Sequence, residues 1–275
     1  MAWAYTFDSD LDVVLQAAHN EELEPLVILL SKDQSGKPLS GCPEFAHYYP
    51  DHQRYVHLIS VKLRALGGHQ VGNLLRRGQG PSYLSVVQSV AAHLKVPFSK
   101  DESITQLEQK LLEHAFSACY QSMDEQDQSL VLEQLTASNE SSGRALVATE
   151  VAAGNFEHLS PKGRLLVAAL VSHAVSRAVG FSLEARALVS TMVGKSWQQL
   201  TLAVSHSLTR LSALFAGLSA VGRPPYQILV PCVLHVATLR LMQAGIKLPP
   251  APTAALGQPE GATDAICAEE APSAD

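Results

Sequence analysis

The segment Val193-Gly194-Lys195-Ser196 has the residue types that end the phosphate-binding loop of nucleotide hydrolases. In such a loop, backbone amides and the lysine hold the phosphates, and another glycine stands five positions before Gly194. Val189 occupies that position here. The loop also follows a β-strand, whereas the residues around Lys195 have the composition of a helix. The segment therefore predicts no nucleotide site.

Asp8, Asp10 and Asp12 have the alternate spacing with which a calcium-binding loop begins. The sixth position of that loop must be glycine and the twelfth should be glutamate, but Val13 and His19 stand there. Aspartate side chains also accept hydrogen bonds from the free amides of a first helical turn. We therefore expect these acids to cap a helix and not to bind calcium.

His47, His52 and His57 lie close in sequence to Glu44 and Asp51, which are residue types that bind metals. Side chains three or four positions apart share one face of a helix, but these histidines are five apart. The HExxH motif of zinc enzymes is absent. We expect surface or interface histidines, and we predict no metal and no cofactor.

Nucleophilic catalysis would need a serine or cysteine beside a base. The sequence has no GxSxG turn, and Ser172-His173 and Ser205-His206 are neighbours that point in different directions on a helix. His235 lies in an apolar run, where a histidine is usually a hydrogen-bonded core residue. We predict no enzymatic activity, and an enzyme without a local motif is the remaining alternative.

The stretch between Gly67 and Tyr83 combines glycines with two arginines in front of an expected helix. Bare amides and guanidinium groups at a helix N-terminus hold an anion or an acidic partner. The alternative is that the glycines serve helix connections that need positive φ. The candidate partner- or anion-binding residues are Asn73, Arg76, Arg77, Gly78, Gly80 and Tyr83.

Composition and cap signals predict that these residues are held by helices. The 275-residue chain is 47% hydrophobic but only 6% aromatic, and it is rich in leucine and alanine, which favour helices over strands. Pro81 stands where a helix has its first residue, Ser103 and Gln106 form a capping box, and Asp124 and Ser160 precede further helices. We predict an all-α fold, a multi-helix bundle of about eight to ten helices with a disordered acidic C-terminal tail.

Charge divides the chain into three parts. Residues 1–159 carry 20 acidic and 11 basic groups, residues 160–247 carry one acid and nine bases, and the last 28 residues carry five acids and no base. With the polar linker before residue 143, this predicts an acidic helical module at 1–136, a basic, apolar helical module at 143–245, and a disordered tail at 246–275.

The apolar module ends in two helical segments separated by Gly222-Arg223-Pro224-Pro225. They are either the core of the bundle or helices that lie on or enter an anionic membrane. No run reaches the 18 apolar residues of a simple transmembrane helix, and dispersed bases with few aromatic residues argue against nucleic acid. The candidate membrane- or partner-facing residues are Leu200, Val204, Leu208, Leu211, Phe215, Arg223 and Tyr226.

The order of several short motifs resembles the YaaW-like family of uncharacterised bacterial proteins, over about residues 5–135 and again over 222–243. That family is in turn distantly similar to the ubiquinol–cytochrome c chaperones, helical assembly factors that bind proteins. The resemblance implies a helical fold and assigns no activity. The matching pieces are Tyr5 with Asp8-Ser9-Asp10-Leu11-Asp12, Asn20-Glu21-Glu22-Leu23, Gly67-Gly68, Arg77-Gly78-Gln79-Gly80 with Tyr83, Leu94-Lys95-Val96, and Gly222-Arg223-Pro224-Pro225-Tyr226 with Pro231.

The leading functional hypothesis is therefore a non-enzymatic, chaperone-like interaction protein that binds another protein. The rival is a peripheral membrane protein that inserts helices from 196–242. The four cysteines lie far apart and the N-terminus has no signal-peptide pattern, so we expect a cytoplasmic location, with a peripheral place at the inner membrane as the alternative. No nucleic acid or small-molecule substrate is predicted.

Overall fold

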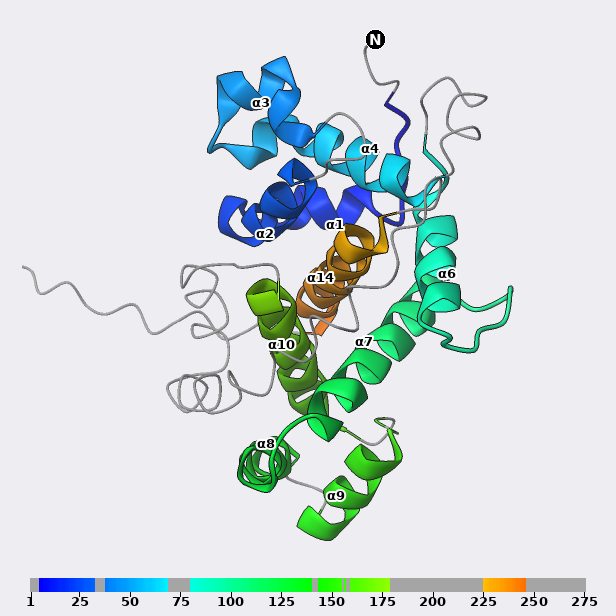
Figure 1. Ribbon diagram of the computed structural model, residues 1–275, viewed down its shortest axis with the longest axis vertical. Helices are drawn as coiled ribbons and strands as arrows, with labels where there is room; N and C mark the ends of the chain where they lie inside the picture. Colours follow the sequence, from blue (N-terminus) through cyan, green and yellow to red (C-terminus); the bar gives the residue numbers. More distant parts are fainter. Residues whose placement is uncertain are drawn as a thin grey trace, which may run out of the picture. The chain divides into compact units, whose positions relative to one another are not determined.

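The computed structural model describes residues 5–32, 38–68, 80–139, 143–154, 156, 159–178 and 225–245 (Figure 1). Within these residues the chain forms ten α-helices, two short 3₁₀ helices and no β-strand, which confirms the predicted all-α fold. The elements are α1 (Asp12–Ala17), α2 (Asn20–Ser31), η1 (Leu39–Gly41), α3 (Pro43–Tyr48), η2 (His52–Tyr55), α4 (Val56–Gly67), α6 (Tyr83–His93), α7 (Ile104–Gln121), α8 (Glu125–Ser138), α9 (Arg144–Ala153), α10 (Pro161–Ala178) and α14 (Tyr226–Gly245).

Three helices begin with the caps that the sequence predicts. The Ser103 hydroxyl accepts from the amide of Gln106 at 3.3 Å and the Gln106 side chain accepts from the amide of Ser103 at 3.0 Å, so α7 has its capping box. Asp124 accepts from an amide in the first turn of α8 at 2.8 Å. The Ser160 hydroxyl does the same for α10 at 3.1 Å.

The start of α6 differs from the prediction. The helix begins at Tyr83, and Ser82 is its N-cap, with a hydroxyl that accepts from the amide of Ser85 at 3.3 Å. Pro81 stays outside the helix, and its carbonyl oxygen accepts from Arg64 Nε at 2.8 Å. A serine hydroxyl can satisfy a free amide of the first turn and proline cannot, so the helix starts two residues later than predicted.

The helix α14 lies in the centre of the packing. It contacts α10, α7, α2, α1, α6 and α4 (Figure 1), and its side chains from Ile228 to Leu239 are nearly all buried. An apolar helix without a polar face must be enclosed by other helices or by lipid. Among the described residues, Tyr226–Ala244 is the one helix long and apolar enough to cross a membrane, and 67% of that window is buried in the fold.

Because α1, α2, α4, α6 and α7 all belong to the predicted acidic module, α14 of the predicted apolar module packs directly against it. The module boundaries at 136 and 143 stay predictions. The tail at 246–275 lies outside the described residues.

Gly80 marks a close approach of two backbones. A Cβ atom at this position would lie 2.4 Å from the carbonyl carbon of Arg64 and 2.6 Å from the amide nitrogen of Ala65. Both neighbours are backbone atoms of α4 and cannot rotate away. Among the described residues, Gly154 is the glycine with positive φ. Position 80 therefore does not need glycine for its dihedral angles, and it needs glycine because there is no room for a side chain.

We therefore expect Gly80→Ala to lower the free energy of unfolding by about 1–3 kcal/mol, because overpacking forces the backbone to shift. Gly143 is the control, since a Cβ there meets nothing within 4 Å. Urea denaturation followed by circular dichroism measures both variants. Equal stability of Gly80→Ala and Gly143→Ala would show that α4 and the segment before α6 do not meet as described.

Candidate functional site

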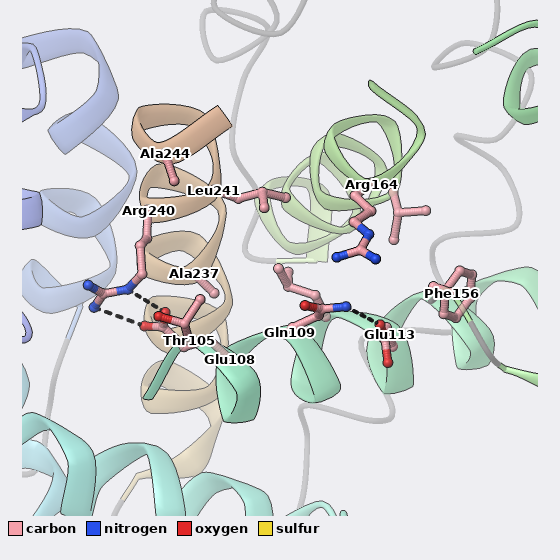
Figure 2. A pocket seen from close by; sticks show the side chains of 12 residues that line it. Thr105, Glu108, Gln109, Glu113, Phe156, Arg164, Ala237, Arg240, Leu241 and Ala244 are labelled. Carbon is pink, nitrogen blue, oxygen red and sulfur yellow. Dashed lines mark hydrogen bonds and ion pairs between the residues drawn. The ribbon is translucent and has the colours of Figure 1, made fainter. Parts of the chain in front are cut away.

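A small groove opens where α7, α10 and α14 meet (Figure 2). Its volume is ≈ 60 Å³, and its lining is almost entirely apolar. Leu112 and Val167 form buried walls, and Gln109, Arg164 and Leu241 are partly exposed at the mouth. The lining residues are Thr105, Glu108, Gln109, Leu112, Glu113, Phe156, Arg164, Val167, Ala237, Arg240, Leu241 and Ala244.

The groove exists because α14 presents small side chains to it. Ala237 and Ala244 leave room between the helices that a leucine would fill. Phe156 closes the far end, where its ring packs edge-on against Phe116 with centroids 5.3 Å apart. At the mouth, Gln109 donates to Glu113 at 2.8 Å, one turn further along α7.

A buried ion pair forms the other end of the groove. Arg240 Nε donates to Glu108 at 2.5 Å, and its Nη2 also donates to Glu108 (Figure 2). Nη2 donates as well to the carbonyl oxygen of Asp10. The Tyr83 hydroxyl donates to the second carboxylate oxygen of Glu108 at 3.0 Å. Glu108 and Tyr83 are both buried, so α7, α14 and α6 share one polar cluster.

Burial and ion pairing have opposite effects on the pKa values of Glu108 and Arg240. Burial raises the pKa of Glu108, against the lowering effect of the Arg240 hydrogen bond and charge. Burial alone would lower the pKa of Arg240, but the hydrogen bond and charge of Glu108 raise it. Burial also raises the pKa of Tyr83, so its hydroxyl stays protonated and donates. The cluster is therefore an ion pair that anchors α14.

Two histidines, His235 and His52, each form the middle of a relay of hydrogen bonds in the interior. His235 Nε2 lies 2.8 Å from the carbonyl oxygen of Glu22, to which it donates, so its Nδ1 accepts from the Ser172 hydroxyl at 3.3 Å. In the second relay, Tyr55 lies 2.5 Å from His52 Nδ1, and His52 Nε2 contacts Glu24. Both place a hydroxyl beside a base, as hydrolases do.

Burial argues for a structural role in both relays. Ser172 and His235 are each 7% exposed, and the Tyr55 ring is fully buried. Burial lowers the pKa of His235, which keeps the imidazole neutral, and burial raises the pKa of Tyr55. None of these residues lines the groove. The relays tie α10 and α2 to α14, and η2 to α2.

Two of the three N-terminal acids accept hydrogen bonds from backbone amides, and Asp12 accepts from the amide of Asp8 at 2.6 Å. Asp8 accepts from the amide of Asp10 at 3.1 Å within its own turn, and also from the amide of Tyr83 at 2.8 Å. The prediction that these acids cap the first helix is wrong, because α1 has no side-chain cap. Asp8 instead accepts from the first amide of α6. Arg64 Nε lies 3.7 Å from the Asp8 carboxylate, and its Nη1 donates to the carbonyl oxygen of Thr6. These contacts hold the N-terminal segment in place.

Histidines and acids do not gather in the part of the chain that the structure describes: no group of three could hold a metal ion. His57 pairs with Glu44 at 3.1 Å, and the His47 ring packs edge-on against Tyr48. His52 belongs to the relay with Glu24.

The predicted partner-binding residues are mostly outside the described residues. Gly80 is buried against α4, and Tyr83 belongs to the Glu108 cluster. Tyr226 is partly buried, and its ring stacks on that of His93 with the centroids 3.8 Å apart. Its hydroxyl forms a hydrogen bond with the Ser89 hydroxyl at 2.9 Å. Their roles in binding stay predictions. Asn73, Arg76, Arg77, Gly78, Leu200, Val204, Leu208, Leu211, Phe215 and Arg223 lie outside the described residues.

A helical bundle with a small apolar groove, in which Glu108, Arg240 and His235 are paired in the interior, is the class of protein that these features define. The chain is similar to the UPF0174 protein YaaW of Escherichia coli O157:H7 and of Escherichia coli K12, with 28% identity over 262 residues that cover 86% of this chain and 96% of each relative. A UPF0174 protein of Helicobacter pylori is 23% identical over 245 residues, which cover 86% of this chain and 93% of that protein.

These relatives support the resemblance to a YaaW-like family of uncharacterised proteins. Their names state no activity and refer to no chaperone. No protein-family model matches the chain. No solved structure matches it either.

Removing one member of the Glu108–Arg240 pair leaves the other charge without its partner. We expect Glu108→Gln to lower the free energy of unfolding by about 3 kcal/mol, and the double variant Glu108→Leu with Arg240→Met to recover much of that loss. Lys110→Met breaks the Lys110–Glu102 pair, whose side chains are more exposed (42% and 20%, against 18% and 3% for Arg240 and Glu108), and should change stability less. Chemical denaturation of the three variants tests this. An equal effect of Glu108→Gln and Lys110→Met would contradict the buried pair.

His235 should make the protein less stable in mild acid. Its folded pKa lies below its ordinary value of about 6.5, so the unfolded chain binds the proton first and stability falls as the pH drops below that value. In His235→Gln, the free energy of unfolding should decline less between pH 7.5 and 5.5 than in the wild type. Parallel declines in wild type and His235→Gln would refute the assignment.

Proposed function

We propose that this protein binds a partner protein through the groove between α7, α10 and α14 and catalyses no reaction. The observation that carries the proposal is an apolar opening, with walls from Leu112, Val167 and Leu241, on an otherwise closely packed helical unit. Open apolar surface between helices is the usual place for the anchor residue of a partner.

The size of the groove supports an anchor side chain over a metabolite. Its volume is ≈ 60 Å³, whereas small-molecule and cofactor sites usually measure about 300–1,000 Å³. One leucine or methionine side chain is the kind of group that enters such a space. The hydroxyl–histidine pairs that could suggest catalysis involve Ser172 and Tyr55, and neither lines the groove.

The arrangement of three helices around the opening suits a helical partner segment. Such segments place apolar side chains from one face into a groove and keep polar ones at its rim. Here Gln109, Glu113 and Arg164 are the polar residues at the rim. A chaperone-like role, in which the groove holds a partner during its assembly, is the narrower form of this proposal.

Filling the mouth of the groove tests the proposal. Ala244 is exposed and lines the mouth, and Ala152 is an equally exposed alanine on α9, away from the groove. We expect Ala244→Trp to reduce recovery of a specific partner at least 10-fold in affinity purification from the native cell with quantitative mass spectrometry, because the indole occupies the space of the anchor. Ala152→Trp should recover that partner as the wild type does. Equal recovery by both variants would rule the groove out.

The same purification tests the other predicted site, with Arg76→Ala and Arg77→Ala combined. Loss of the partner in that double variant alone would move the binding site to the glycine- and arginine-rich segment.

The membrane hypothesis has one observation in its favour, the length and apolar composition of Tyr226–Ala244. Flotation with anionic and neutral liposomes distinguishes it from the groove proposal. Flotation of the full-length protein that requires anionic lipid supports the membrane hypothesis, and absence of flotation with either lipid contradicts it.

A further inference from the structure

A second surface, independent of the groove, combines one exposed and two partly buried aromatic rings with carboxylates. It lies on α3 and η2 and consists of Phe45, Tyr48, Tyr49, Glu44 and Asp51; we call it the aromatic–acidic patch. None of the residues of α3 is buried, and α3 has substantial contacts only with the neighbouring short helices η1 and η2. Four aromatic residues lie between positions 45 and 55, in a chain that is only 6% aromatic.

Tyr49 is the exposed ring of the patch, and Phe45 and Tyr48 are partly buried. Tyr49 is 52% exposed, and its ring lies 5.2 Å from that of Phe45 with a tilt of 35°. Phe45 in turn packs 5.6 Å from the buried ring of Tyr55, which supports the patch from below. An exposed tyrosine with its neighbours already ordered loses little conformational freedom on binding, which is why tyrosine is common at the centre of interfaces.

The patch already holds one arginine of this chain. The Arg54 guanidinium carbon lies 5.8 Å from the centroid of the Tyr48 ring, and its Nε is 3.3 Å from Asp51. Both side chains are well exposed, so this pair forms at the surface and not because burial imposes it. In the patch, one guanidinium of this chain therefore already lies over a ring and beside a carboxylate.

The patch carries more carboxylates than arginines or lysines. Glu44 is half exposed and pairs with His57, Asp51 is 48% exposed and pairs with Arg54, and Glu24 is 32% exposed and pairs with His52. Arg54 is the one arginine or lysine between positions 38 and 61. In the described chain no guanidinium lies over the Tyr49 ring, whereas Tyr48 has Arg54.

From this complementarity we infer that the aromatic–acidic patch binds an arginine-bearing segment of a partner protein, with the guanidinium over Tyr49 and its N–H groups toward Glu44 or Asp51. Arginine suits the site better than lysine, because a planar guanidinium stacks on a ring and bonds a carboxylate at the same time. Nucleic acid and anionic lipid are disfavoured, since their phosphates would face the carboxylates of the patch.

Binding of labelled peptides to the full-length protein tests the inference. Three probes of equal length, alternating glycine with arginine, lysine or glutamate, are titrated by fluorescence anisotropy at low salt. We expect the arginine peptide to bind several-fold more tightly than the lysine peptide, and the glutamate peptide not to bind. Failure of the arginine peptide to bind, or equal binding of the arginine and lysine peptides, overturns the inference.

Variants of Tyr49 distinguish binding by its ring from general electrostatic attraction and from loss of folding. Tyr49→Leu should weaken the arginine peptide about two- to five-fold, the range of an exposed cation–π contact, while Tyr49→Phe keeps the ring and should bind as the wild type. Glu44→Gln should weaken binding, and Glu133→Gln, an exposed acid on α8, should not. Unchanged binding in Tyr49→Leu, or equal loss in Glu44→Gln and Glu133→Gln, shows general attraction to an acidic surface and overturns the inference.

Discussion

The rest of the described structure depends on enclosing an apolar helix that carries one guanidinium. The side chains of α14 from Ile228 to Leu239 are nearly all covered by other helices, and the next residue is Arg240. A charge at the edge of such a core costs several kcal/mol unless it is paired, so Glu108 on α7 faces it and Tyr83 on α6 holds the carboxylate. One ion pair thereby joins three helices and forms one end of the groove.

Other polar side chains serve the same purpose over long distances in sequence. Asp8 satisfies the first amide of α6, and His235 connects α14 to α2 and α10. Each of these groups resembles part of a metal site or a catalytic centre when the sequence is considered alone. In a bundle with few charged residues, a buried polar atom must be matched, and the matches found here are structural. The two surfaces proposed above for binding are instead open ones, the groove and the aromatic–acidic patch.

The helical class and several helix starts could be predicted, because caps such as Ser103 and Asp124 act within one turn. The start of α6 is predicted two residues too early, although its cap Ser82 also acts within one turn. The bond from the amide of Tyr83 to Asp8, 75 positions away, could not be predicted. The groove also could not, because it arises where three helices cross. One signal was present: Glu108 and Arg240 each interrupt an apolar face and each need a partner, but nothing in the sequence pairs them.

The central place of α14 has a consequence for biosynthesis. Its partners α1 and α2 lie more than 190 residues earlier in the chain. At ordinary translation rates of about 5–20 residues per second, they leave the ribosome roughly 10–40 s before α14 does. During that interval the nascent chain exposes the faces that α14 later covers. Protection from aggregation in those seconds has to come from the earlier helices packing on one another or from cellular holding factors.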